Sequence, residues 1–162
     1  MMAFWDTSAV LALIYVEPRS PDAAVARSLS AGRYAWRWMA VEAQAGLARR
    51  RARPAEWEAL DRILSDFQYV DLSVEQTAGV GRANRDWRLR ASDAGHLYCF
   101  QQVAFALPDM QLICFDEEIN TAASAIGLSI WTPPAAGMPD RVQVREKART
   151  YGRSAGGKKP RP

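Results

Sequence analysis

Four acidic residues occupy equivalent places along the chain. Asp6 and Asp116 each follow a short apolar run with the character of a buried strand, and residues at helical spacing come directly after each. Glu42 and Asp93 each lie near the start of a segment with helical periodicity. In a parallel sheet with right-handed crossovers, strand ends and helix starts meet at one edge. We therefore expect the four carboxylates to lie together in space.

The residue types at this edge indicate a particular chemistry. Clustered carboxylates repel one another and raise each other's pKa unless a cation lies between them. Their hard oxygen ligands favour Mg²⁺ or Mn²⁺, and such an ion can activate water for attack on phosphorus. We therefore expect Asp6, Glu42, Asp93 and Asp116 to be metal ligands of a site that hydrolyses phosphodiester bonds.

Three further side chains near the acids leave two interpretations open. Ser8 could hydrogen-bond a ligand carboxylate or a nucleic-acid phosphate, or it could simply cap the helix that follows. His96, the single histidine, lies one helical turn after Asp93 and is either a proton donor or a packed or hydrogen-bonded helix residue. Glu118 could reach a metal through water, or be solvated beside Glu117.

Strand-like and helix-like segments alternate along the chain. Expected strands end at Asp6 and span 34–36, 69–72, 112–115 and 129–131; expected helices follow Asp6 and span 22–29, 39–51, 55–67, 73–87, 93–107 and 117–126. Ser73 and Gln76 form a capping-box pattern, Ser92 is a candidate N-cap, and Gly127 is a candidate C-cap. This alternation is typical of an α/β fold with a parallel sheet.

Charge divides the chain into an acidic body and a basic tail. Residues 141–162 hold eight basic residues and one acid, which leaves residues 1–140 with 13 basic and 17 acidic residues. We predict one domain over residues 1–134 and a basic, largely disordered tail over 135–162, with at most a short helix at 141–150. The tail could add salt-sensitive RNA affinity or only solubility.

The cysteines and the apolar segments indicate the cellular compartment of the protein. Cys99 and Cys114 have no metal-ligand spacing and lie in apolar surroundings, so we expect buried free thiols. No apolar run approaches the roughly 20 residues that span a bilayer, and no leader pattern is visible. We expect a cytoplasmic protein with no membrane partner.

Four blocks of the sequence resemble a known family. They are DTSAV at Asp6, VEAQAGLARR at Glu42, LRASDAGHL at Asp93 and ICFDEEINTAASAIGL at Asp116. In order and placement, over about residues 3–134, they resemble the PIN-domain family and its VapC ribonuclease toxins of bacterial toxin–antitoxin pairs.

The resemblance implies a three-layer α/β/α fold whose central parallel sheet has four to five strands in the order 3-2-1-4-5. It also implies a magnesium-dependent endoribonuclease that forms homodimers and is inhibited by a small VapB-like antitoxin, whose C-terminal segment occupies the active-site groove. By position, it assigns active-site roles to Asp6, Glu42, Asp93 and Asp116, with Thr7 or Ser8 as the hydroxyl beside the first acid.

Other functions remain open at this point. The chain could be a PIN-like RNA- or protein-binding module without catalysis, or a PIN nuclease of RNA processing that is no toxin. A flavodoxin-like phosphoacceptor or nucleotide-binding domain is disfavoured, because the chain lacks a glycine-rich phosphate loop. Gly95 departs from the family pattern, which usually has a larger small residue at this place in the helix. A glycine within a helix costs roughly 1 kcal/mol relative to alanine.

Overall fold

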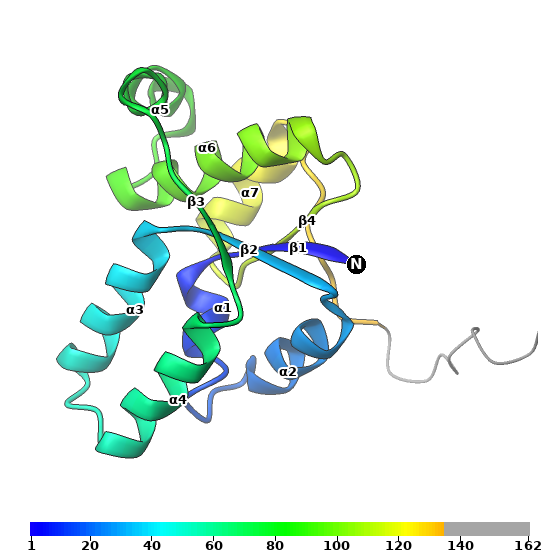
Figure 1. Ribbon diagram of the computed structural model, residues 1–162. Coiled ribbons are helices and arrows are strands. Elements are labelled where there is room, and N and C mark those ends of the chain that lie inside the picture. Colours follow the sequence, from blue (N-terminus) through cyan, green and yellow to red (C-terminus); the bar gives the residue numbers. More distant parts are fainter. Residues whose placement is uncertain (135–162) are drawn as a thin grey trace, which may run out of the picture.

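The computed structural model describes residues 1–134 and shows alternating strands and helices (Figure 1). The strands are β1 (Met2–Trp5), β2 (Gly32–Trp36), β3 (Gln68–Val70) and β4 (Gln111–Ile113). The helices are α1 (Thr7–Leu11), α2 (Ser20–Leu29), α3 (Trp38–Arg49), α4 (Pro54–Leu64), α5 (Val74–Trp87), α6 (Ala91–Ala106) and α7 (Glu117–Ala125). The expected basic tail, with its short helix, lies outside the described residues.

The four strands form one parallel sheet in the order β3-β2-β1-β4. An isolated parallel bridge between Leu112 and Ile130 places residues 129–131 beside β4, in the position of the expected fifth strand. The chain builds outward from β1 to β2 and β3 on one side, and then crosses to β4 on the other. The order therefore reverses between β1 and β4, which is where open α/β sheets bind ligands.

Helices cover both faces of the sheet, as the sequence predicts. Along β1, Ala3 and Trp5 face the layer of α1 to α4, where Trp5 contacts Phe67 with ring centroids 6.0 Å apart. Phe4 faces the layer of α6 and α7 and lies 5.5 Å from Phe100. All three β1 side chains are fully buried, so β1 is the centre of both hydrophobic cores.

Helix boundaries confirm two of the expected caps and correct the third. The Ser73 hydroxyl accepts a hydrogen bond from the Gln76 backbone amide (3.2 Å) and the Gln76 side chain accepts one from the Ser73 amide (2.8 Å). Gly127 follows α7 with a φ of +75°, a conformation that favours glycine. The expectation for Ser92 is wrong, because α6 begins at Ala91 and Arg90 is its N-cap without a side-chain hydrogen bond.

Other boundaries differ by a few residues from those expected. α1 ends at Leu11, and the apolar residues after it continue as turns. α4 ends at Leu64, so Phe67 lies outside the helix and enters the core. β3 begins at Gln68, one residue before its expected start. Within residues 1–134, none of the helices has both the length and the apolar character needed to cross a bilayer.

Candidate active site

Asp6 ends β1 and begins α1, and its side chain is held in place by the helix it caps. Oδ2 accepts hydrogen bonds from the Ser8 amide (2.9 Å) and the Ser8 hydroxyl (2.6 Å). The Asp6 backbone amide donates to the carbonyl of Ile113 in β4 (3.0 Å). The side chain is 6% exposed, so a charged group lies at a nearly buried strand end. Such a charge is costly unless other groups stabilise it.

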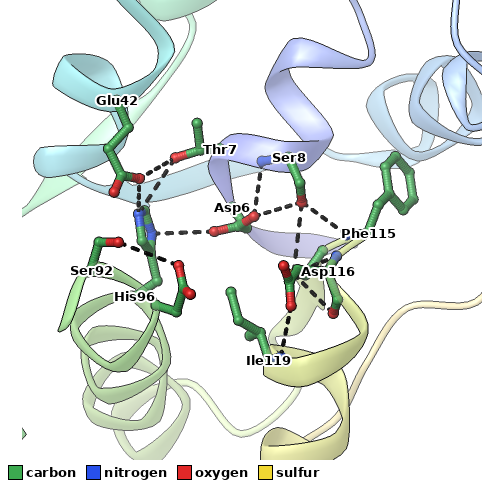
Figure 2. A network of polar contacts seen from close by, with 11 residues as sticks. Asp6, Thr7, Ser8, Glu42, Ser92, His96, Phe115, Asp116 and Ile119 are labelled. Atoms are coloured by element: carbon green, nitrogen blue, oxygen red, sulfur yellow. Dashed lines mark hydrogen bonds and ion pairs between the residues drawn. The ribbon is translucent and has the colours of Figure 1, made fainter. Parts of the chain in front are cut away.

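Ser8 links the ends of β1 and β4. Its hydroxyl donates to Asp6 and accepts a hydrogen bond from the Phe115 backbone amide at 3.0 Å. Because the hydroxyl proton is engaged by Asp6, the structure favours carboxylate orientation over direct phosphate binding for this residue. Figure 2 shows Ser8 between Asp6 and the segment that carries Asp116.

Asp116 caps the N-terminus of α7. Its Oδ1 accepts hydrogen bonds from the backbone amides of Glu118 (2.8 Å) and Ile119 (3.1 Å). These amides, together with the helix dipole, stabilise the negative charge of the carboxylate. Glu118 itself is exposed, and only its backbone takes part in this arrangement. Glu118 therefore contributes a backbone amide to the site.

Asp93 lies in the first turn of α6 and belongs electrostatically to the same site. Partial burial raises its pKa, and the negative charges of Asp116 and Asp6 raise it further, with a smaller contribution from Glu42. A hydrogen bond from the Ser92 hydroxyl (3.3 Å) opposes this shift. Charges far apart or well screened would not have this effect, so the acids share one electric field.

Glu42, on α3, pairs with a histidine. The Nε2 of His96 lies 2.7 Å from Glu42 Oε2, and the Thr7 hydroxyl donates to the same oxygen at 2.6 Å. Burial alone would raise the pKa of Glu42, but the hydrogen bonds from His96 and Thr7 lower it overall.

His96 lies between Glu42 and Asp6. Burial disfavours its charged form, yet the hydrogen bond to Glu42 and the charges of Asp6, Glu42 and Asp93 raise its pKa overall. Its side chain is 1% exposed, and Nδ1 lies 3.6 Å from Asp6 Oδ1 without a hydrogen bond. The pKa shifts of Glu42 and His96 therefore each favour the charged form of the side chain.

The predicted site residues thus lie at one edge of the sheet, but they do not form a closed ligand set. In the part of the chain that the structure describes, no three His, Cys, Asp or Glu side chains make a group that could already hold a metal ion. Hydrogen bonds there engage Oδ2 of Asp6 and Oδ1 of Asp116, leaving the other oxygen of each. The oxygen donors and the mutual repulsion at Asp93 suit a hard cation.

Two features of the site were not predicted from the sequence. His96 is packed and hydrogen-bonded, as one interpretation of the sequence had it, but its place between two acids was not predicted. Trp36, at the end of β2, contacts the His96 ring edge-to-face, with centroids 5.2 Å apart. The sequence signal for this contact was the tryptophan at the end of the expected strand 34–36.

Cys99 and Cys114 are buried free thiols as expected. Burial raises the pKa of Cys99 to about 12.

Comparison with known proteins supports the fold. No protein-family model matches the sequence. No curated protein matches it either. A crystal structure of PAE2754 from Pyrobaculum aerophilum is 20% identical over 75% of this chain and 86% of that one, with a TM-score of 0.54. The crystal structure of VapC20 from Mycobacterium tuberculosis, titled a sarcin–ricin loop cleaving toxin, is 18% identical over 81% of this chain and 99% of that one, with a TM-score of 0.61. The chain therefore has the PIN-like α/β/α fold that its sequence predicts.

Proposed function

We propose that the chain is a metal-dependent endoribonuclease that hydrolyses RNA phosphodiester bonds and serves as the toxin of a VapBC-type pair. One observation carries the proposal: Asp6 and Asp116 cap α1 and α7, and Asp93 lies in the first turn of α6, beside the point where the strand order reverses. The raised pKa of Asp93, to which the charges of Asp116 and Asp6 contribute, agrees with this placement. Carboxylates grouped in this way favour a divalent cation and, through it, a phosphate group.

Residues of the chain prepare the carboxylates for this role. Ser8 fixes the rotamer of Asp6, and the first amides of α7 fix that of Asp116, so each presents one remaining oxygen. Holding these groups before substrate arrives lowers the entropic cost of assembling the reactive arrangement.

Asp6, Asp93 and Asp116, with Glu42, are the residues that would hold Mg²⁺ or Mn²⁺. Bound there, the ion supplies polarisation of the phosphate and a lowered pKa of water. The raised pKa of Asp93 supports this assignment, since a cation would relieve the repulsion that the aspartates exert on one another.

A groove between the end of α5 and the start of α7 offers space for a substrate strand. It has a volume of about 590 Å³ and is lined by Trp87 and Arg88 at the end of α5 and by Glu117 and Glu118 at the start of α7. Arg88 supplies a cation and Trp87 an aromatic surface, the groups that bind phosphates and stack on bases. Glu117 directly follows Asp116 in the sequence, so one wall of the groove begins next to a candidate metal ligand.

The likeness to VapC20 extends the proposal to substrate and partners. That protein is described as cleaving the sarcin–ricin loop, and we propose a structured RNA as substrate for this chain too. We also propose a VapB-like antitoxin, a homodimer and a cytoplasmic location. Light scattering on the purified chain should give twice the mass of the 18.0 kDa protomer, and the product of an adjacent small reading frame should block cleavage.

The function is tested with purified full-length protein and total RNA. Wild type should cleave with Mg²⁺ and not with EDTA, and Asp6→Asn should lose the magnesium-dependent cleavage. Asp61→Asn is the matched control, because Asp61 is exposed on α4 and lies outside the site. Equal cleavage by wild type and Asp6→Asn would refute the role of Asp6, and cleavage unaffected by EDTA would refute the metal requirement.

A second candidate function follows from the lack of a closed ligand group within residues 1–134. With Glu42 engaged by His96 and Thr7, the domain could bind RNA or protein without catalysis. Calorimetry distinguishes the two candidates: heat of Mn²⁺ binding that disappears in Asp6→Asn supports the nuclease. RNA binding by wild type with no divalent-ion binding supports the non-catalytic module.

A further inference from the structure

Trp36 and Gly95 are fitted to one another. A Cβ atom built on Gly95 would overlap Cζ3 and Cη2 of the Trp36 ring, so the ring lies directly against the backbone of α6. The same ring meets His96, the next residue of the helix, at an interplanar angle of 83°. Gly95 therefore provides the space that brings the tryptophan against the histidine.

The imidazole of His96 is restrained on several sides. Trp36 packs against the ring, α6 carries it, and Nε2 is 2.7 Å from Glu42 Oε2. The Thr7 hydroxyl, at the start of α1, donates to the same carboxylate oxygen. Side chains from α6 and α1 therefore both contact the same Glu42 oxygen.

Glu42 acts on Asp93 more weakly than the other aspartates do. Among the acids that raise the pKa of Asp93, Glu42 has the smallest effect, behind Asp116 and Asp6. His96 lies between Glu42 and Asp6, with a ring nitrogen facing a carboxylate on each side. The ring of His96 therefore fills the space between Glu42 and Asp6.

We propose that His96 is a positioning residue. Its imidazole, fixed against Trp36 in the space left by Gly95, donates a hydrogen bond from Nε2 to Glu42 and fixes the orientation of that carboxylate for divalent-ion binding. This role rests on the proposed nuclease function. The part assigned to His96 is the Nε2 hydrogen bond and not proton transfer to substrate.

The geometry of the link can be measured without a metal. His96 is the single histidine of the chain, so its imidazole nitrogens are assigned in a long-range ¹H–¹⁵N spectrum without ambiguity. We expect a protonated Nε2 whose proton exchanges slowly and whose signal shifts in Glu42→Gln. A ring protonated only at Nδ1, or a signal unaffected by Glu42→Gln, would overturn the proposal.

Two substitutions separate positioning from general packing. Glutamine can place its amide nitrogen where Nε2 of histidine lies, whereas asparagine can reach only the Nδ1 position. His96→Gln should therefore keep the Mn²⁺ affinity measured by calorimetry within about threefold, and His96→Asn should weaken it by about tenfold or more, the range seen when a residue that orients a metal ligand is lost. Phe105→Ala is the control on the same helix, since Phe105 is 91% exposed.

The outcomes distinguish this role from the proposed function. If wild type binds Mn²⁺ and cleaves RNA, and His96→Asn does both equally well, the positioning role is wrong and the nuclease stands. If His96→Gln loses Mn²⁺ affinity as severely as His96→Asn while both remain folded by circular dichroism, the Nε2 hydrogen bond is not the group that matters. If wild type neither binds Mn²⁺ nor cleaves RNA, the proposed function fails and this role fails with it.

Discussion

Replacing Gly95 with alanine tests the contact between α6 and Trp36. The added methyl group would overlap the outer edge of the Trp36 ring, at Cζ3 and Cη2. That ring also packs against Trp38, with centroids 6.2 Å apart, and against His96. Moving the ring away from α6 therefore disturbs two further contacts.

Two opposing effects set the magnitude. Alanine is favoured over glycine within a helix by roughly 1 kcal/mol. Inserting a methyl group into packed surroundings costs about 1 to 3 kcal/mol. We expect Gly95→Ala to lower the free energy of unfolding by about 1 kcal/mol, which corresponds to a fall in Tm of about 3 °C for a domain of this size.

Gly81 is the matched control, because it also lies within a helix. A Cβ atom at Gly81 in α5 would meet no atom within 4 Å, so only the helix preference remains. Gly81→Ala should raise the free energy of unfolding by about 1 kcal/mol. In a Trp36→Phe background, Gly95→Ala should be less destabilising than in wild type, since phenylalanine lacks the outer edge of the tryptophan ring.

Urea unfolding followed by circular dichroism measures all four variants under the same conditions. The coupling between positions 36 and 95 comes from the double-mutant cycle. Stabilisation by Gly95→Ala equal to that by Gly81→Ala would refute the reasoning, because it would mean that Trp36 does not restrict this helix face.

Two further predictions concern pH and the Ser8 hydroxyl. The pKa of His96 is raised above its ordinary 6.5 by Glu42 and the other carboxylates despite burial, so His96 stabilises the fold fully below pH about 6.5 and progressively less as the pH rises through the raised pKa. Urea unfolding across pH should show this loss in wild type and not in His96→Gln; the same slope in both would contradict it. Ser8→Ala leaves the Phe115 amide without its acceptor and should cost about 1 to 3 kcal/mol, whereas Ser28→Ala, at an exposed position on α2, should cost much less. Similar unfolding midpoints for these two variants would show that the bond to Phe115 contributes little.

The fold was largely predictable because its signals are local. Apolar runs of strand length end at Asp6 and Asp116, and a capping box at Ser73 marks the start of a helix. Each of these signals depends on neighbours a few residues away. The parallel sheet follows from their alternation, since parallel strands need crossovers of a dozen or more residues.

The sequence predicted that the acids lie at strand ends and helix starts, but not which group lies between two of them. The position of His96 between Asp6 and Glu42 depends on the crossing of three elements, and no local pattern encodes that. Gly95 looked unfavourable within a helix, and only the Trp36 ring explains it. The Ser92 cap was wrong because the helix begins at Ala91, two residues earlier than expected, which leaves Ser92 to hydrogen-bond Asp93.

The most direct test of a shared acidic site is the titration of Asp93. Carboxyl ¹³C NMR of wild type and Asp116→Asn would follow its pKa in each protein. We expect the pKa of Asp93 to lie above its ordinary value of 3.8 in wild type and to fall in Asp116→Asn, because the neighbouring charge is removed. An unchanged pKa of Asp93 in Asp116→Asn would contradict the claim that these carboxylates act together.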